Sequence, residues 1–144
     1  MPNIKLMESA LPVAPLKIAA LDSCIDLGKK VNDYIVTFRQ DSLKKYLDSP
    51  LFSTYKQDNY LIDGKDLFVM VDVCNHSLTY TVNGHLNHMS PDDHYQDLKR
   101  VISAASGKAH RVNVIMPFLY ESRQHKRTKR ESLDCAFALQ ELVD

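Results

Sequence analysis

A short, strongly basic segment is the part of this 144-residue chain that most directly suggests chemistry. From Arg123 to Arg130 the sequence reads Arg-Gln-His-Lys-Arg-Thr-Lys-Arg, so five of the eight residues are Lys or Arg and none is acidic. Arginine presents a planar fork that bridges phosphate oxygens, and lysine presents a compact positive charge. The segment therefore predicts a polyphosphate clamp, although a solvated basic loop or a nonspecific nucleic-acid patch has the same composition.

The elements predicted on either side place this segment at the end of a strand. Residues 112–116 are mostly apolar and end at Pro117, which is typical of a buried strand. A helix is expected to begin near Ser132, and its predicted apolar face consists of Cys135, Ala138, Leu139 and Leu142. Because open α/β sheets bind ligands beyond the carboxyl ends of their strands, the basic segment is predicted to lie at the ligand-binding edge.

The rest of the chain alternates between strand and helix patterns, with apolar runs at 16–21 and 67–71 that suit buried strands. Ser23 is predicted to cap a helix, with Asp26 as the capping-box partner. The predicted core face of that helix consists of Leu27, Val31, Tyr34, Ile35 and Phe38. Alternation of this kind predicts an α/β domain with a parallel sheet.

Further along the chain, Asn83-Gly84 lies between residues 78–82 and 85–89 and predicts a β-hairpin, since both residues tolerate positive φ. Ser90, Pro91 and Asp93 then form the pattern of a capped helix start. The predicted apolar stripe of that helix is Leu98, Val101, Ile102 and Ala105, and Gly107 is expected to end it. Residues 1–15 hold three of the six prolines and are expected to form an irregular arm.

Composition excludes several classes of protein. The chain has 18 basic and 18 acidic residues, which argues against a histone-like nucleic-acid binder. Its four glycines are scattered, so neither a Gly-x-Gly-x-x-Gly fingerprint nor a Walker-type loop is present. The three cysteines have no short spacing, which suggests free thiols in a reducing cytoplasm. No stretch approaches the apolar length of a membrane span, so a soluble cytoplasmic protein is expected.

Four histidines within a short stretch raise the alternative of a metal site. They are His76, His85, His88 and His94. Because a spacing of three places His85 and His88 on opposite faces of a strand, ordinary surface histidines are the favoured interpretation, and no metal ligand is assigned.

The stretch from Asn113 to Arg130 resembles the ribose-phosphate pyrophosphokinase family, also called phosphoribosyl pyrophosphate synthetase. That family has an apolar strand ending in proline, then aromatic residues, then an Arg-Gln pair that opens a basic flexible loop, then a helix rich in Ala and Leu. Residues 132–143 match the helix, and the chain is most similar to a divergent bacterial-type branch with an enlarged hairpin region. The resemblance implies a phosphoribosyltransferase-like fold with a β-hairpin insertion, in which residues 16–144 form the N-terminal domain of a two-domain enzyme.

The resemblance also implies an activity, which is transfer of the diphosphoryl group of ATP to ribose 5-phosphate with Mg²⁺. On the family pattern Arg123 and Gln124 contact ATP. The residues of the flexible phosphate loop are His125, Lys126, Lys129 and Arg130. Phe52 is expected to hold the adenine bound by a neighbouring subunit of a homo-oligomer formed through this domain, although Lys56 replaces the acidic residue of that segment.

The family's second domain carries the metal-binding histidines, the catalytic Lys/Arg pair and the sugar-phosphate loop. None of these is found here, so the catalytic residues stay unassigned and this chain alone is expected to be inactive. The alternative hypothesis is a noncatalytic regulatory or assembly subunit that binds nucleotide or a full-length relative. No membrane partner and no specific nucleic acid is expected.

Overall fold

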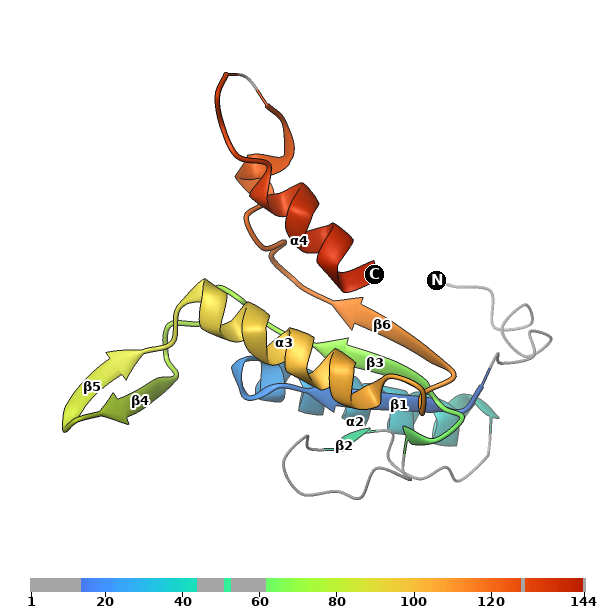
Figure 1. Cartoon of the computed structure of the whole chain (residues 1–144). Helices are drawn as coiled ribbons and strands as arrows, with labels where there is room; N and C mark the ends of the chain where they lie inside the picture. The colour runs from blue at the N-terminus through green and yellow to red at the C-terminus, as the bar shows by residue number, and fades with distance from the viewer. Residues whose placement is uncertain (1–13, 44–50, 53–61, 128, 144) are drawn as a thin grey trace.

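The computed structural model describes residues 14–43, 51–52, 62–127 and 129–143. Its centre is a parallel sheet in the order β2-β1-β3-β6 (Figure 1). The strands are β1 (Leu16–Ala20), β2 (Leu51–Phe52), β3 (Asp66–Met70) and β6 (Arg111–Ile115). The α/β fold with a parallel sheet is therefore confirmed.

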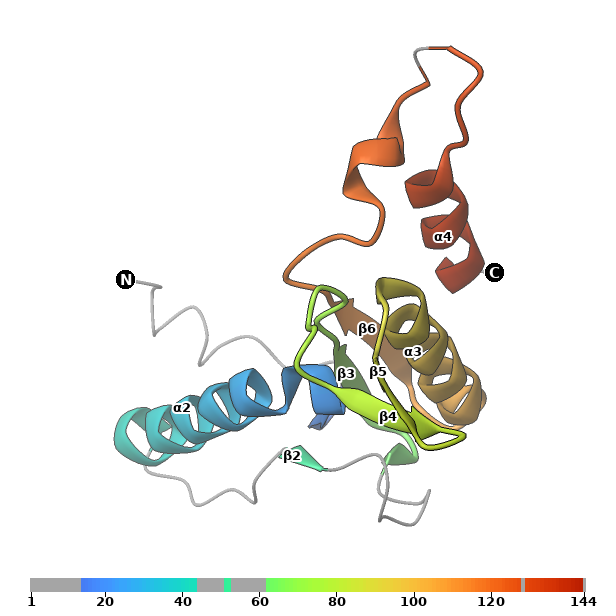
Figure 2. The same ribbon diagram turned by 90° about the vertical axis from the view of Figure 1, so that its left-hand side faces the viewer.

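Helices cover both faces of this sheet, with α2 (Ile25–Leu43) on one face and α3 (Pro91–Ala105) on the other (Figures 1 and 2). Successive side chains of a strand point to opposite faces, so β3 contributes to two cores. Leu67 and Val69 pack with Leu98 of α3, whereas Met70 packs in the cluster that Val31 of α2 joins. The last helix, α4 (Asp134–Val143), adds Ala138 to the core on the α3 side.

The start of α2 differs from the prediction. A short 3₁₀ turn, η1 (Asp22–Cys24), precedes the helix, and Ser23 lies inside that turn. The buried Ser23 hydroxyl accepts a hydrogen bond from the Asp72 backbone N–H at 3.2 Å. The predicted capping box of Ser23 and Asp26 is therefore wrong, because the hydroxyl is used to join the ends of β1 and β3.

The predicted core face of α2 is correct in part. Leu27 is 42% exposed and Tyr34 is 73% exposed, so these two residues do not face the core. The buried positions are Gly28 and Asn32, four residues apart on one face. Val31 and Ile35 pack against the cluster that holds Met70, as predicted, so the helix is turned just enough to leave Leu27 and Tyr34 outside.

The hairpin and the start of α3 match their predictions. Strands β4 (Thr79–Val82) and β5 (His85–His88) pair antiparallel around Asn83 and Gly84, whose φ angles are 51° and 79°. Before α3, the Asp93 N–H donates to the Ser90 hydroxyl at 3.2 Å, and the Ser90 N–H donates to the Asp93 carboxylate at 2.8 Å. Both bonds of the predicted capping box are therefore present.

The end of the chain is less buried than its apolar sequence predicts. Ile115 is 39% exposed because β6 lies at an edge of the described sheet. In α4, Cys135 and Ala138 are buried as predicted, but Leu139 is 43% exposed. None of the described helices has the length and hydropathy needed to cross a membrane.

Candidate phosphate-binding site

The basic loop (residues 123–130, of which Thr128 lies outside the described residues) begins in a short 3₁₀ helix beyond the carboxyl end of β6. This helix is η3 (Ser122–His125), so Arg123 and Gln124 occupy its centre. The loop extends away from the sheet before the chain returns into α4 (Figure 1). Its position past the end of a parallel strand agrees with the prediction.

The cations of this loop are open to a ligand. Its exposed side chains are Arg123, Lys126, Arg127, Lys129 and Arg130. Among the described residues, none of these five forms an ion pair with a carboxylate. Several unpaired positive charges on one short segment repel each other in the absence of an anion, and a polyphosphate would relieve that repulsion.

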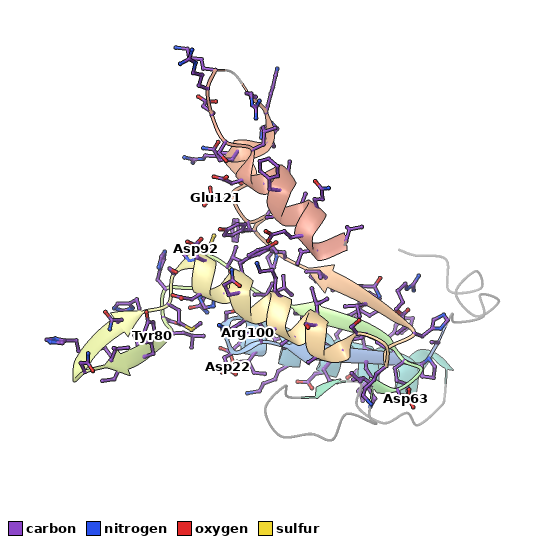
Figure 3. All side chains as sticks on the ribbon, in the orientation of Figure 1. Asp22, Asp63, Tyr80, Asp92, Arg100 and Glu121 are labelled. Carbon is purple, nitrogen blue, oxygen red and sulfur yellow. The ribbon has the colours of Figure 1, made fainter. Side chains whose placement is uncertain are left out.

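Tyr120 attaches the start of the loop to α3. Its ring stacks on the ring of Tyr95 with centroids 4.4 Å apart, and its hydroxyl donates to Asp92 Oδ1 at 2.6 Å. Asp92 lies at the start of α3, facing the segment that carries Glu121 (Figure 3). The hydrogen bond to Asp92, together with burial, raises the pKa of Tyr120 above its usual range. These contacts therefore fix the position of Tyr120, from which the loop begins.

The other end of the loop is attached to the same helix through α4. The Tyr95 hydroxyl donates to the backbone carbonyl of Ala138 at 2.6 Å. Lys99 Nζ lies 5.2 Å from the centroid of the Tyr95 ring and 3.0 Å from Glu141 Oε2. Tyr95 thus contacts both the segment that enters the loop and the helix that leaves it. No motif in the sequence links Tyr95, Asp92 and Tyr120, so sequence reasoning missed this network.

Phe52 lies at the opposite edge of the sheet from the basic loop. It ends β2 and pairs with Ala19 of β1, whereas the loop follows β6. Three strand spacings separate β2 from β6, which is roughly 14 Å at the usual spacing. One chain therefore does not bring Phe52 together with Arg123 and Gln124, and the role of Phe52 stays a prediction. Its side chain and Lys56 lie outside the described residues.

A half-open cavity of about 260 Å³ lies between η1, α3 and the base of the hairpin. Its charged lining residues are Asp22, Asp97 and Arg100, and Asp22 and Arg100 both lie on this side of the domain (Figure 3). Arg100 Nη1 already donates to Asp97 Oδ1 at 2.7 Å. Two carboxylates against one paired guanidinium disfavour a polyphosphate, so the basic loop is the stronger candidate for an anion.

The carboxyl ends of β1 and β3 are joined into a rigid frame near this cavity. Asn75 Nδ2 donates to the Ser23 carbonyl at 2.8 Å, and His94 Nε2 lies 2.8 Å from the Asn75 carbonyl. The contact of His94 with a carbonyl oxygen identifies Nε2 as its protonated nitrogen. His94 is 2% exposed, and its role is to stabilise the fold through this hydrogen bond.

The other histidines do not assemble a metal site among the described residues. The hairpin register pairs Val82 with His85 and Thr79 with His88, which places the two histidines on opposite faces as predicted. Within the described ranges, no group of three or more His, Cys, Asp or Glu side chains could hold a metal ion.

A second group of charges lies at the opposite, amino end of the sheet. Arg111 donates to both carboxylate oxygens of Asp66, from Nε at 3.0 Å and from Nη2 at 2.5 Å. Asn113 Nδ2 donates to the same carboxylate at 2.7 Å. Hydrogen bonds from Arg111, joined by that from Asn113, lower the pKa of Asp66 below its usual range. These side chains satisfy one another, so this cluster is structural.

The comparison with known protein families gives a match over most of the chain. A family model described as the N-terminal domain of ribose phosphate pyrophosphokinase matches residues 16–144. The chain belongs to this family. No curated protein and no solved structure matched it. The resemblance inferred from Asn113 to Arg130 is therefore confirmed, and the match extends over β1, α2 and the hairpin as well.

Proposed function

We propose that this pyrophosphokinase domain binds the phosphates of ATP through its basic loop. The reaction it would serve is transfer of the ATP diphosphoryl group to ribose 5-phosphate, which yields phosphoribosyl pyrophosphate and AMP. The observation that carries the proposal is a set of exposed cations beyond the carboxyl end of β6, none of them ion-paired with a described residue, in a chain of this family. A diphosphoryl group bears several negative charges, so positioning and charge neutralisation dominate its transfer.

The residues of the loop have different tasks in this proposal. Arg123 offers a bidentate fork to phosphate, and the Gln124 side chain offers amide hydrogen bonds. His125 Nδ1 lies 2.8 Å from the Ser122 carbonyl, so its other ring nitrogen donates to phosphate only in the protonated form. Closure of Lys126, Lys129 and Arg130 over the phosphates would exclude water, which otherwise diverts the group to hydrolysis.

Mg²⁺ would enter this site with ATP, since the described part of the chain offers no group of three or more metal-ligating side chains. The chemistry that Mg²⁺ would supply is neutralisation of phosphate charge. The chain's own residues then need only to bind and orient the magnesium nucleotide, which is what exposed Arg and Lys side chains do.

The adenine is proposed to be held between subunits. Because Phe52 and Arg123 lie at opposite edges of the sheet, a shared site needs the β2 edge of a second chain beside the loop of the first. This geometry supports a homo-oligomer formed through this domain. The three free cysteines support a cytoplasmic location, where thiols stay reduced.

Titration of the chain with ATP and Mg²⁺, followed by calorimetry, tests the proposal. Arg123→Ala should weaken binding by about tenfold or more, because a bidentate charged contact is lost. Arg100→Ala is the matched control, since Arg100 is an exposed arginine of α3 outside the loop. Unchanged affinity in Arg123→Ala, or an equal loss in both variants, would contradict the proposal.

A further inference from the structure

The hairpin β4-β5 projects from the domain and is free of fixed charge (Figures 1 and 2). Residues 73–91 contain no Lys, Arg, Asp or Glu, although 25% of the chain is charged. All the residues of both strands are exposed, and no described strand pairs with the outer edge of either one. Native proteins usually protect such edges with lysine, proline or a bulge, and an unprotected edge is a template for pairing with another strand.

The register of the hairpin shows which backbone groups of β4 are available. The Met89 N–H donates to the Leu78 carbonyl at 2.9 Å, so Leu78 and Met89 form a hydrogen-bonded pair. Bonded and non-bonded pairs alternate along an antiparallel ladder, which makes Tyr80 a bonded partner of β5 as well. Thr79 and Thr81 therefore direct their N–H and C=O groups away from β5, toward the free edge.

We propose that β4 pairs antiparallel with β4 of a second copy of this chain, centred on Tyr80. In a two-fold pairing of identical strands, the central residue lies opposite its own copy. With Tyr80 at the centre, Thr79 lies opposite the partner's Thr81 and Thr81 lies opposite the partner's Thr79. All the outward backbone groups of the two threonines are then satisfied, in a four-stranded antiparallel sheet.

This register also brings the two Tyr80 side chains into contact at its centre. The two Tyr80 residues would form a non-hydrogen-bonded pair, in which Cα atoms approach to about 4.5 Å and aromatic rings contact each other. Tyr80 is 44% exposed in the single chain, so this pairing would remove apolar surface from water. A register centred on Thr81 would instead place Thr79 opposite the partner's Asn83, whose positive φ lies outside the strand conformation.

The lack of charge favours a second copy of the chain as the partner. A hairpin that recognised nucleic acid or a charged peptide would carry complementary charges. Self-pairing instead needs an uncharged strand, because any charge on it would lie close to the same charge on the second copy and be repelled. The residues of β4 are Thr, Tyr, Thr and Val, all favoured in strands, whereas β5 includes His and Asn.

Disulfide trapping tests both the partner and the register. Tyr80→Cys is made in a Cys74→Ser background, since Cys74 is exposed and the other two cysteines are buried. Mild oxidation should then give a covalent dimer, because Cα atoms about 4.5 Å apart satisfy disulfide geometry. Thr81→Cys in the same background is the matched control. Its own copy would lie about 8 Å away diagonally, so cross-linking should be at least about tenfold slower.

A monomer in the Tyr80→Cys protein, or equal or faster cross-linking at Thr81→Cys, would overturn the proposal. A second pair of variants distinguishes the β4 edge from the β5 edge. Added to the Tyr80→Cys protein, Thr81→Lys should slow cross-linking about tenfold by placing a charge on the paired edge. Leu86→Lys, at the position opposite Thr81 in β5, should leave the rate unchanged. Equal effects of the two lysines would also overturn the proposal.

Discussion

Two arginines, one in strand β6 and one in the loop that follows it, have different roles. Arg111 begins the strand and is held by both oxygens of Asp66, whereas Arg123 follows the strand and has no ion pair with a described residue. The side chains are chemically identical, and the neighbouring strand decides their role. Where β3 places a carboxylate opposite the arginine, the charge stabilises the fold. Where the chain has left the sheet, the charge is available to a ligand.

The largest expected effect is the loss of stability when the carboxylate that holds Arg111 is removed. Asp66→Ala should destabilise the domain by about 2 kcal/mol, because Arg111 and Asn113 lose their shared acceptor. The value lies below that of a fully buried ion pair because the Arg111 side chain is 49% exposed. Urea denaturation gives the free energy of unfolding.

The matched control is Asp63→Ala, since Asp63 is an exposed carboxylate near the same end of β3. It should change stability by less than about 0.5 kcal/mol, and so should Arg123→Ala in the basic loop. A loss in Arg123→Ala as large as that in Asp66→Ala would contradict the distinction between a structural arginine and a ligand-binding one.

A smaller effect is expected at the attachment of the loop. Tyr120→Phe removes the donor to Asp92 and keeps the stack on Tyr95, so stability should fall by about 1 kcal/mol. Tyr34→Phe removes a hydroxyl from a tyrosine that is 73% exposed and should have no measurable effect. Equal values for the two variants, measured by thermal denaturation, would show that the bond to Asp92 does not stabilise the domain.

The smallest expected effect is the pH dependence of the stability that Asp66 contributes through Arg111 and Asn113. The pKa of Asp66 is lowered in the folded state, so its contribution is complete above the ordinary carboxyl pKa of about 3.9. That contribution is lost as the pH falls through the lower, folded value. The stability difference between the wild type and Asp66→Asn should therefore narrow below about pH 4. A difference that stays constant through that range would show that the ionised carboxylate is not what Arg111 stabilises.

Much of this fold follows from local patterns in the sequence. The Asn83-Gly84 turn and the capping box at Ser90 were predictable because each depends on residues close together in the chain. The role of Ser23 was not predictable, because its hydroxyl accepts a hydrogen bond from the backbone N–H of Asp72, which is 49 positions away. Leu27 and Tyr34 were wrongly assigned to the buried face of α2, since a large apolar residue gives the same periodic pattern whether or not it reaches the sheet.

The candidate site likewise has features that the sequence predicts and features that depend on long-range packing. The charge density of the basic loop is visible in the sequence, and so is its place after a strand. The attachment of the loop is not, because Tyr120 and Asp92 are 28 positions apart and are joined only by the packing of the segment after β6 on α3. Likewise, Asp66 and Arg111 are 45 positions apart, so no local pattern separates a structural arginine from a ligand-binding one.

Affinities for ATP, ADP and AMP, each with Mg²⁺, test most directly whether the exposed cations of the basic loop bind phosphate. Calorimetry on the wild type should show affinity rising with each added phosphate, and the rise should shrink at high salt because exposed charges are screened. In a variant with Lys126, Lys129 and Arg130 all changed to alanine, the three affinities should converge. Equal affinities for the three nucleotides in the wild type would contradict the account, as would an unchanged ranking in the variant.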